Sequence, residues 1–214
     1  MIVGESSEKG SGQSLVEFSL VLPFLLLLLL GMVDVGYAFY DYIVLTATNR
    51  EGVRLASRGR FDNHAVASRI VSSGGMEEVE GSMENRFRTD GPDSNFGMIM
   101  THFPIDENGD LEMSNVTKYL TGTIQIEDEI RYITADDSRI EGDYEGFHGD
   151  ITRKINTRRE AAGYDAQHNE IVVIETFFAH ETFFPTFLDL LQIPKPLTLY
   201  SSGSMRVLRD SRID

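Results

Sequence analysis

The feature that most constrains this chain is a long apolar segment close to its N-terminus. Between Phe18 and Val33 it carries no charged residue, and six consecutive leucines, Leu25–Leu30, form its centre. Counted from Gln13, the segment has roughly 21 residues, which as a helix would span about 31 Å, the thickness of a bilayer's hydrocarbon core. The sequence has no second segment of this kind to cover it, so we predict a membrane-spanning helix over residues 13–33.

One acidic residue at the start of this segment calls for a physical explanation. Glu17 lies where the apolar run begins, and a carboxylate there is costly unless it is paired or close to the interface. In an ordinary signal anchor the carboxylate would reach back to the headgroups. With a cationic partner it would instead be tolerated in lipid, because each charge relieves the desolvation of the other.

The residues around Glu17 resemble the start of a known family. Gly12, followed by Gln13-Ser-Leu-Val-Glu-Phe18 and a long apolar run, is similar to the type III signal of type IV prepilins. The whole opening resembles TadE-like minor pilins or pseudopilins of the Tad (tight adherence) type IV pilus family. The segments Gly36–Tyr40 and Thr48–Ala56 fit the same family, so the resemblance extends over about residues 12–58.

The resemblance implies a set of processing and assembly residues. A prepilin peptidase would cleave after Gly12 and leave Gln13 as the new N-terminus. Glu17 and Phe18 would then lie in the part of the helix used for subunit assembly, with Glu17 beside the N-terminal amine of a neighbouring subunit. The implied partners are membrane lipid, other pilin or pseudopilin subunits and the prepilin peptidase.

Composition limits what the rest of the chain can do. The 214 residues leave room for one modest domain after the membrane helix, and 19 Lys and Arg against 34 Asp and Glu give a net charge of -15. Such an acidic chain disfavours binding of nucleic acid. The absence of cysteine excludes disulfides, thiolate metal ligands and a cysteine nucleophile.

The charges that flank the membrane helix give an ambiguous topology. A count of basic residues, with Arg50 and Arg54 after the helix, would place the C-terminal part in the cytoplasm. These arginines lie at the limit of the range in which the rule applies, and large domains cross largely regardless of charge. The resemblance implies a single-pass protein of the bacterial inner membrane with an extracytoplasmic C-terminal domain, associated with a pilus.

Beyond the membrane, residues 34–58 are expected to continue the helix as an amphipathic stalk. Their apolar residues recur at steps of three and four, and Pro23 is expected to kink the membrane part unless packing compensates. Two interpretations of the aromatic side chains at the start of the stalk stay open, namely an interfacial belt and a subunit contact. They are Tyr37, Phe39, Tyr40 and Tyr42.

The remaining residues predict a small α+β domain. Asp62 is a good N-cap for a short helix over residues 63–72, and residues 76–95 are expected to form a mobile loop. Strands are predicted at residues 96–103, 123–126, 131–134, 170–178, 198–200 and 204–208, with a short helix around residues 152–162. The predicted fold is a long N-terminal helix packed on a small antiparallel sheet, with a pilin-like architecture. The predicted division is a leader over 1–12, a membrane helix over 13–33, a stalk over 34–58 and a domain over 59–214.

No residue pattern indicates an enzyme, a cofactor or a metal site. The five histidines are scattered singly, and the Asp106–Asp110 segment favours a hairpin turn over a calcium loop because its glycine is in the wrong place. The sequence therefore predicts a minor pilin or pseudopilin that assembles through its helix. The alternative is a single-pass envelope protein that does not polymerise and carries a binding or scaffold domain.

Overall fold

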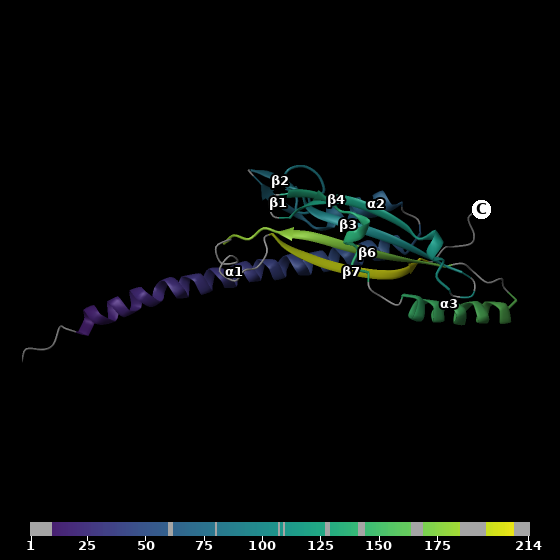
Figure 1. The fold of residues 1–214 in the computed structure, drawn as a ribbon, viewed down its shortest axis with the longest axis horizontal. Helices are drawn as coiled ribbons and strands as arrows, with labels where there is room; N and C mark the ends of the chain where they lie inside the picture. The colour runs from purple at the N-terminus through teal and green to yellow at the C-terminus, as the bar shows by residue number, and fades with distance from the viewer. Residues whose placement is uncertain are drawn as a thin grey trace, which may run out of the picture.

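The protein consists of a long N-terminal helix whose second half lies against a β-rich domain (Figure 1). The computed structural model describes residues 10–59, 62–79, 81–106, 108, 110–126, 129–140, 144–163, 169–184 and 196–207. The helices are α1 (Gly10–Ala56), α2 (Asn63–Ser73) and α3 (Tyr144–Ala161), with 3-10 turns η1 (Met113–Asn115) and η2 (Ala135–Asp137). The strands are β1 (Met76–Val79), β2 (Ser82–Asn85), β3 (Asn95–Ile105), β4 (Thr117–Ile126), β5 (Glu129–Tyr132), β6 (Asn169–His180) and β7 (Leu197–Val207).

The main sheet is antiparallel throughout, with the strand order β5-β4-β3-β6-β7. Strand β6 lies between β3 and β7 and is buried along almost its whole length, as its continuous apolar sequence predicts. A separate hairpin pairs β1 with β2. In Figure 1 the first half of α1 extends away from this domain, and α3 lies at the opposite end of the molecule.

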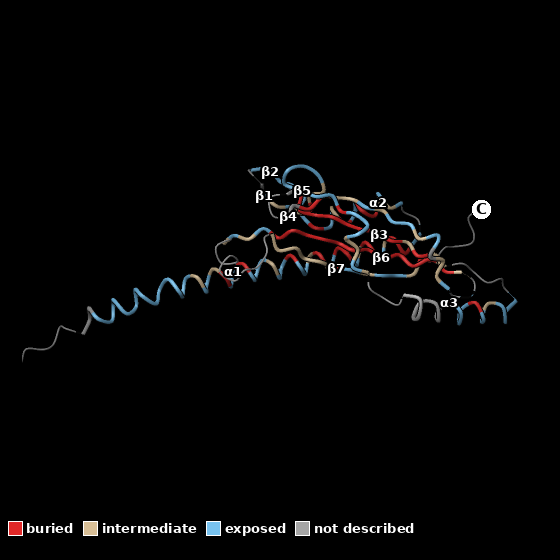
Figure 2. Tube along the Cα trace, viewed as in Figure 1, coloured by how far each residue is buried: buried red, intermediate tan, exposed pale blue. Residues whose placement is uncertain are grey.

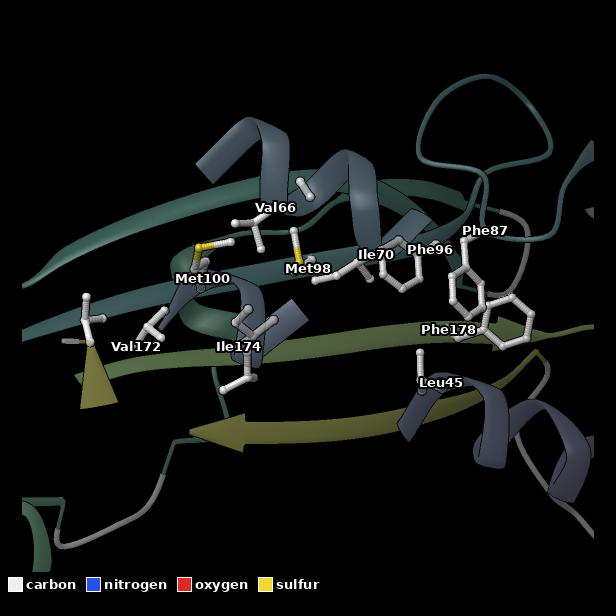
Figure 3. Packing of buried hydrophobic residues seen from close by; sticks show 14 residues of the cluster. Leu45, Val66, Ile70, Phe87, Phe96, Met98, Met100, Val172, Ile174 and Phe178 are labelled. Carbon is white, nitrogen blue, oxygen red and sulfur yellow. The ribbon is translucent and has the colours of Figure 1, made fainter. Parts of the chain in front are cut away.

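Both α1 and α2 cover the same face of the sheet. Leu45 and Val53 of α1 share one apolar core with Val66 and Ile70 of α2, and the close-up in Figure 3 shows α2 over the strands. The strand residues of this core alternate along β3 and β6, because successive side chains of a strand point to opposite faces of the sheet. They are Phe96, Met98, Met100, Val172, Ile174 and Phe178.

A glycine allows the two helices to approach each other. A Cβ atom at Gly52 of α1 would lie 2.3 Å from Cδ1 of Ile70, far inside van der Waals contact. The sequence suggests only that Gly52 weakens α1, by up to about 1 kcal/mol relative to alanine. The structure shows that its missing side chain creates the space that Ile70 fills.

The opposite face of the sheet is covered by loop segments, which a buried carboxylate holds in place. Glu175 of β6 is fully buried. It accepts hydrogen bonds from the Ser138 hydroxyl (2.6 Å), the backbone N–H of Arg139 (2.6 Å) and the Tyr200 hydroxyl (2.9 Å). These donors supply the partners that a buried polar group needs. Glu175 thereby ties the segment after η2 to the centre of the sheet.

Several predictions of structure are confirmed. The long helix on an antiparallel sheet is present. The helix α1 includes Pro23 without interruption, and the kink expected there stays a prediction. Asp62 is the N-cap of α2, with its side chain accepting a 2.6 Å hydrogen bond from the backbone N–H of Ala65. The predicted helix around 152–162 is longer than expected and begins at Tyr144.

The prediction of a mobile loop over residues 76–95 was wrong for its first half. Residues 76–79 and 82–85 form the strands of the β1–β2 hairpin, with Gly81 at a positive φ of 84° before β2. Its strands are short and its described side chains are mostly exposed, so they lack the apolar alternation on which the prediction depended. An ion pair between Glu77 of the hairpin and Arg88 ties it to the chain that leads into β3.

A buried asparagine is expected to be a principal attachment of α1 to the sheet. Asn49 is fully buried, and its amide Nδ2 donates to the carbonyls of Ile174 (3.0 Å) and Ser201 (3.2 Å) and to Thr176 Oγ1 (3.0 Å). Asn49→Ala removes the amide that donates to Ile174 and Thr176, while the Ser201 carbonyl keeps a 3.2 Å hydrogen bond from Thr176 Oγ1, so the free energy of unfolding should fall by about 1–3 kcal/mol. Thermal and denaturant unfolding of the full chain in detergent measures it.

The neighbouring residue supplies the control for this prediction. Arg50 is exposed on the next position of the same helix, and Arg50→Ala should change the unfolding free energy by no more than about 0.5 kcal/mol. Equal effects of the two substitutions would contradict the role given to Asn49.

Candidate functional site

The first half of α1 presents apolar side chains to its surroundings instead of to the domain. Figure 2 shows this part of the helix as exposed. The helix is long and apolar enough to cross a membrane, and only 6% of its most apolar 18-residue stretch is buried in the molecule. A core helix of a globular protein would be mostly buried, so a membrane is the environment that suits these side chains. Those most exposed include Leu15, Phe18, Leu20, Phe24, Leu28 and Met32.

The predicted assembly residues lie on this free part of α1. Glu17 Oε1 accepts a 3.1 Å hydrogen bond from the side-chain amide of Gln13, one turn earlier on the exposed helix surface. No ion pair joins Glu17 to another residue in the described part of the chain. Phe18 is exposed beside it. Gly12 lies within α1, which begins at Gly10, and the predicted cleavage between Gly12 and Gln13 stays a prediction.

A cluster of buried polar side chains marks the point where α1 meets the domain. Asp34 and Asp41 of α1 are 3% and 4% exposed. Asp34 Oδ1 accepts a 2.8 Å hydrogen bond from the backbone N–H of Phe183, just after β6. Asp41 pairs with the guanidinium of Arg86 and accepts from Nδ1 of His180 at 2.5 Å. We call Asp34, Asp41, Arg86 and His180 the interfacial cluster.

The charges of the interfacial cluster balance only in part. Arg86 lies over the ring of Tyr40, 4.7 Å from its centroid, and neutralises Asp41. Burial lowers the pKa of His180, with Arg86 acting in the same direction, while Asp34 and Glu181 oppose the shift. The imidazole is therefore neutral at pH 7, and its Nδ1 proton is donated to Asp41.

The sequence analysis did not identify this cluster. It noted Asp34 and Asp41 only as the first charges after the membrane segment. Their spacing was a usable signal, because residues seven apart lie on one face of a helix. Their partners could not be found in this way, since Arg86 and His180 are 45 and 139 residues from Asp41 in the chain.

The aromatic side chains at the start of the stalk divide into two sets. The ring of Tyr37 packs against that of Phe183 with centroids 4.9 Å apart, and Tyr40 lies under Arg86. All four side chains, Phe39 and Tyr42 included, are exposed, so the two sets differ in their contacts and not in their burial. The domain covers only part of the expected amphipathic stripe, since Val53 and Ala56 are buried in the domain whereas Val35 and Ile43 are exposed.

The arginine row of the stalk and one of the scattered histidines also have partners within the protein. In the arginine row, Arg54 forms a two-pronged pair with Glu51, at 3.0 and 2.9 Å. Nδ1 of His102 is hydrogen-bonded to the carboxylate of Glu170, and Nε2 of His102 is hydrogen-bonded to Oδ1 of Asn63. Among the described residues no group of three or more His, Asp or Glu side chains could hold a metal ion. His148 and His168 lie outside the described side chains.

The lowered pKa of His180 predicts a loss of stability in acid. In the unfolded chain His180 takes up its proton near the ordinary pKa of 6.5, whereas the folded protein takes it up only at lower pH. The unfolded state therefore binds more protons as the pH falls through about 6.5, and the folded state loses stability there. Melting temperatures of the wild type and His180→Gln, measured between about pH 8 and pH 5, test this. The wild type should lose more stability than the variant, and parallel curves would contradict the assignment.

Comparison with known proteins identifies the N-terminal part of the chain. The family model described as TadE-like protein matches residues 12–54. No curated protein and no solved structure matches the chain. The match covers the free apolar half of α1 and most of the stalk, and it confirms the resemblance seen in the sequence. Residues 12–54 are therefore similar to TadE-like proteins, and they contain most of the one helix in the described part of the chain that is long and apolar enough to cross a membrane.

Proposed function

We propose that this protein is a minor pilin or pseudopilin subunit of a Tad-type pilus or secretion system. In this proposal residues 1–12 are a leader, 13–33 span the bacterial inner membrane, 34–58 form the stalk, and 59–214 form an extracytoplasmic domain. A prepilin peptidase cleaves between Gly12 and Gln13. The protein then assembles beside other pilin subunits through α1.

The observation that carries the proposal is the state of Glu17. It is an acid on the exposed half of a membrane helix, and its hydrogen bond from Gln13 is a neutral one. An amide gives a carboxylate much less stabilisation than a cation does in a medium of low dielectric constant. The N-terminal amine of a neighbouring processed subunit would supply that cation and relieve the desolvation of both charges.

The length of the exposed apolar surface supports helix packing over a simple anchor. Val35, Phe39 and Ile43 continue this surface at steps of four residues, on a face that the sheet does not cover. From Gln13 to Ile43 the helix measures about 46 Å, whereas a bilayer core is about 30 Å thick. Part of the stripe therefore projects beyond the hydrocarbon. A second helix packed alongside would bury it, whereas a protein that never polymerises would leave it among the polar headgroups and at their outer edge.

Mass spectrometry of the N-terminus tests processing directly. The full chain, produced together with a prepilin peptidase and purified from membranes, should begin at Gln13. Gly12→Leu should leave Met1 intact, because the peptidase requires a small residue before the cut in the proposed scheme. An intact Met1 in the wild-type protein would favour the envelope protein that does not polymerise.

Removal of the acid tests assembly. Glu17→Ala removes one partner of a buried charge pair, a change that costs about 3–5 kcal/mol and corresponds to more than about a hundredfold loss of incorporation. The amount of protein in sheared filaments, compared with the amount in membranes, measures this loss. Ser19→Ala, close by on the same exposed segment, is the matched control. Membrane insertion and cleavage should be unchanged in both variants, and normal incorporation of Glu17→Ala would refute the charge pairing.

A further inference from the structure

A polar cleft opens beside the interfacial cluster. It has a volume of about 300 Å³. Its lining includes Tyr37 and Asp41 from α1, Arg86 and Arg88 from the segment after β2, and His180 and Glu181 from the end of β6. A cleft of this size reaches the lower end of the range for small-ligand sites.

Two buried polar atoms of this lining have no hydrogen-bond partner in the described structure. His180 is 3% exposed, and its Nε2 is unmatched. Because Nδ1 donates its proton to Asp41, Nε2 of the neutral ring is an acceptor that lacks a donor. Nε of Arg86 is a donor that lacks an acceptor. Unsatisfied buried groups are uncommon, and a ligand that both donates and accepts would match these two. Because both atoms are fully buried, the side chains beside them have to shift when such a ligand binds.

A shallow and open apolar groove of about 440 Å³, formed by side chains of α1 alone, adjoins the polar cleft. It is lined by Met32, Val33, Gly36, Tyr37 and Tyr40, and it shares Tyr37 with the cleft. Gly36 leaves the groove open, since a Cβ atom built there would meet nothing within 4 Å. Because Met32 and Val33 end the apolar segment, the groove connects the polar cleft with the membrane-spanning part of the helix.

The position along α1 places both features at the bilayer surface. Tyr37 lies about 6 Å and Asp41 about 12 Å beyond Val33 along the helix axis. The headgroup layer on each side of a bilayer is about 5–8 Å thick. The groove therefore begins at the level of the acyl chains, and the cleft lies at the level of the headgroups and just above them.

We propose that the cleft and groove together bind one phospholipid whose headgroup carries a primary amine, of the phosphatidylethanolamine type. The ammonium group donates to Nε2 of His180 and lies near the carboxylate of Glu181. A phosphate oxygen accepts from Nε of Arg86. An acyl chain occupies the groove over Gly36 and continues into the bilayer.

The chemistry of the cleft selects this headgroup over the other common ones. A choline headgroup has no N–H and cannot satisfy an acceptor such as His180 Nε2. An anionic glycerol headgroup brings a net negative charge to a cleft where Asp41, Glu77 and Glu181 already outnumber Arg86 and Arg88. A zwitterion with a donating ammonium group fits both the charges and the unmatched atoms. The assignment holds whether or not the leader is removed.

Native mass spectrometry of the full chain in detergent tests the assignment. With equal amounts of phosphatidylethanolamine, phosphatidylcholine and phosphatidylglycerol present, the ethanolamine lipid should be retained several-fold more than the other two. Gly36→Leu fills the groove with a side chain and should abolish this preference. Val35→Leu, an exposed neighbour outside the groove, is the matched control and should retain it.

A second variant tests the polar end without removing the charge beside Asp41. Arg86→Lys keeps a cation there but loses the Nε donor, so retention should again fall several-fold while the melting temperature shows that the domain is folded. Equal retention of the three lipids, or unchanged retention in both variants, would overturn the proposal. Free phosphoethanolamine should compete poorly. If it bound as well as the lipid, the cleft would belong to a soluble ligand and the lipid assignment would fail.

Discussion

The structure depends on the way in which one continuous helix is held along only half of its length. From Asp34 onwards α1 is fixed to the sheet by buried polar groups, with Asn49 at the centre and the interfacial cluster at the membrane end. Before Asp34 the described helix is almost entirely exposed (Figure 2). Directional hydrogen bonds to strand carbonyls fix the rotation and the height of α1 on the sheet, which apolar contacts alone would define less sharply. The domain therefore presents the free half of α1 in a defined direction.

Three acids along α1 illustrate how the environment of a carboxylate decides its role. Asp41 is neutralised by Arg86 and accepts a hydrogen bond from His180, so its role is to hold α1 to the domain. Asp34 accepts one backbone hydrogen bond, and its second oxygen has no partner in the described structure. Among the described residues, Glu17 accepts a hydrogen bond from the amide of Gln13 and forms no ion pair. Within the described residues Asp41 is thus the only one of the three with a cationic partner, and Glu17 is the one that lies on the exposed apolar half of the helix, where a partner from another molecule can reach it.

The sequence predicted those features whose cause is local. The apolar length of residues 13–33, the N-cap Asp62 and the buried run of β6 each express a preference of neighbouring residues, and each is found in the structure. The β1–β2 hairpin was missed because its mostly exposed strands carry no apolar alternation and are held by an ion pair to Arg88. The interfacial cluster was missed because its members come from three distant segments. No pattern within a short window contains Asp41, Arg86 and His180 together.

The interfacial cluster also explains why polar groups are tolerated beside an apolar helix. A buried carboxylate or guanidinium is expensive in hydrocarbon but is stabilised at the headgroup level, where charges and water are available. If the cluster lay one or two turns earlier on α1, Asp41 and Arg86 would enter the bilayer core. If it lay later, the aromatic rings of Tyr37 and Tyr40 would lose their amphipathic surroundings. The position of these residues just beyond Val33 therefore couples two separate requirements. It fixes the domain to its helix, and it sets how deeply that helix can enter the membrane.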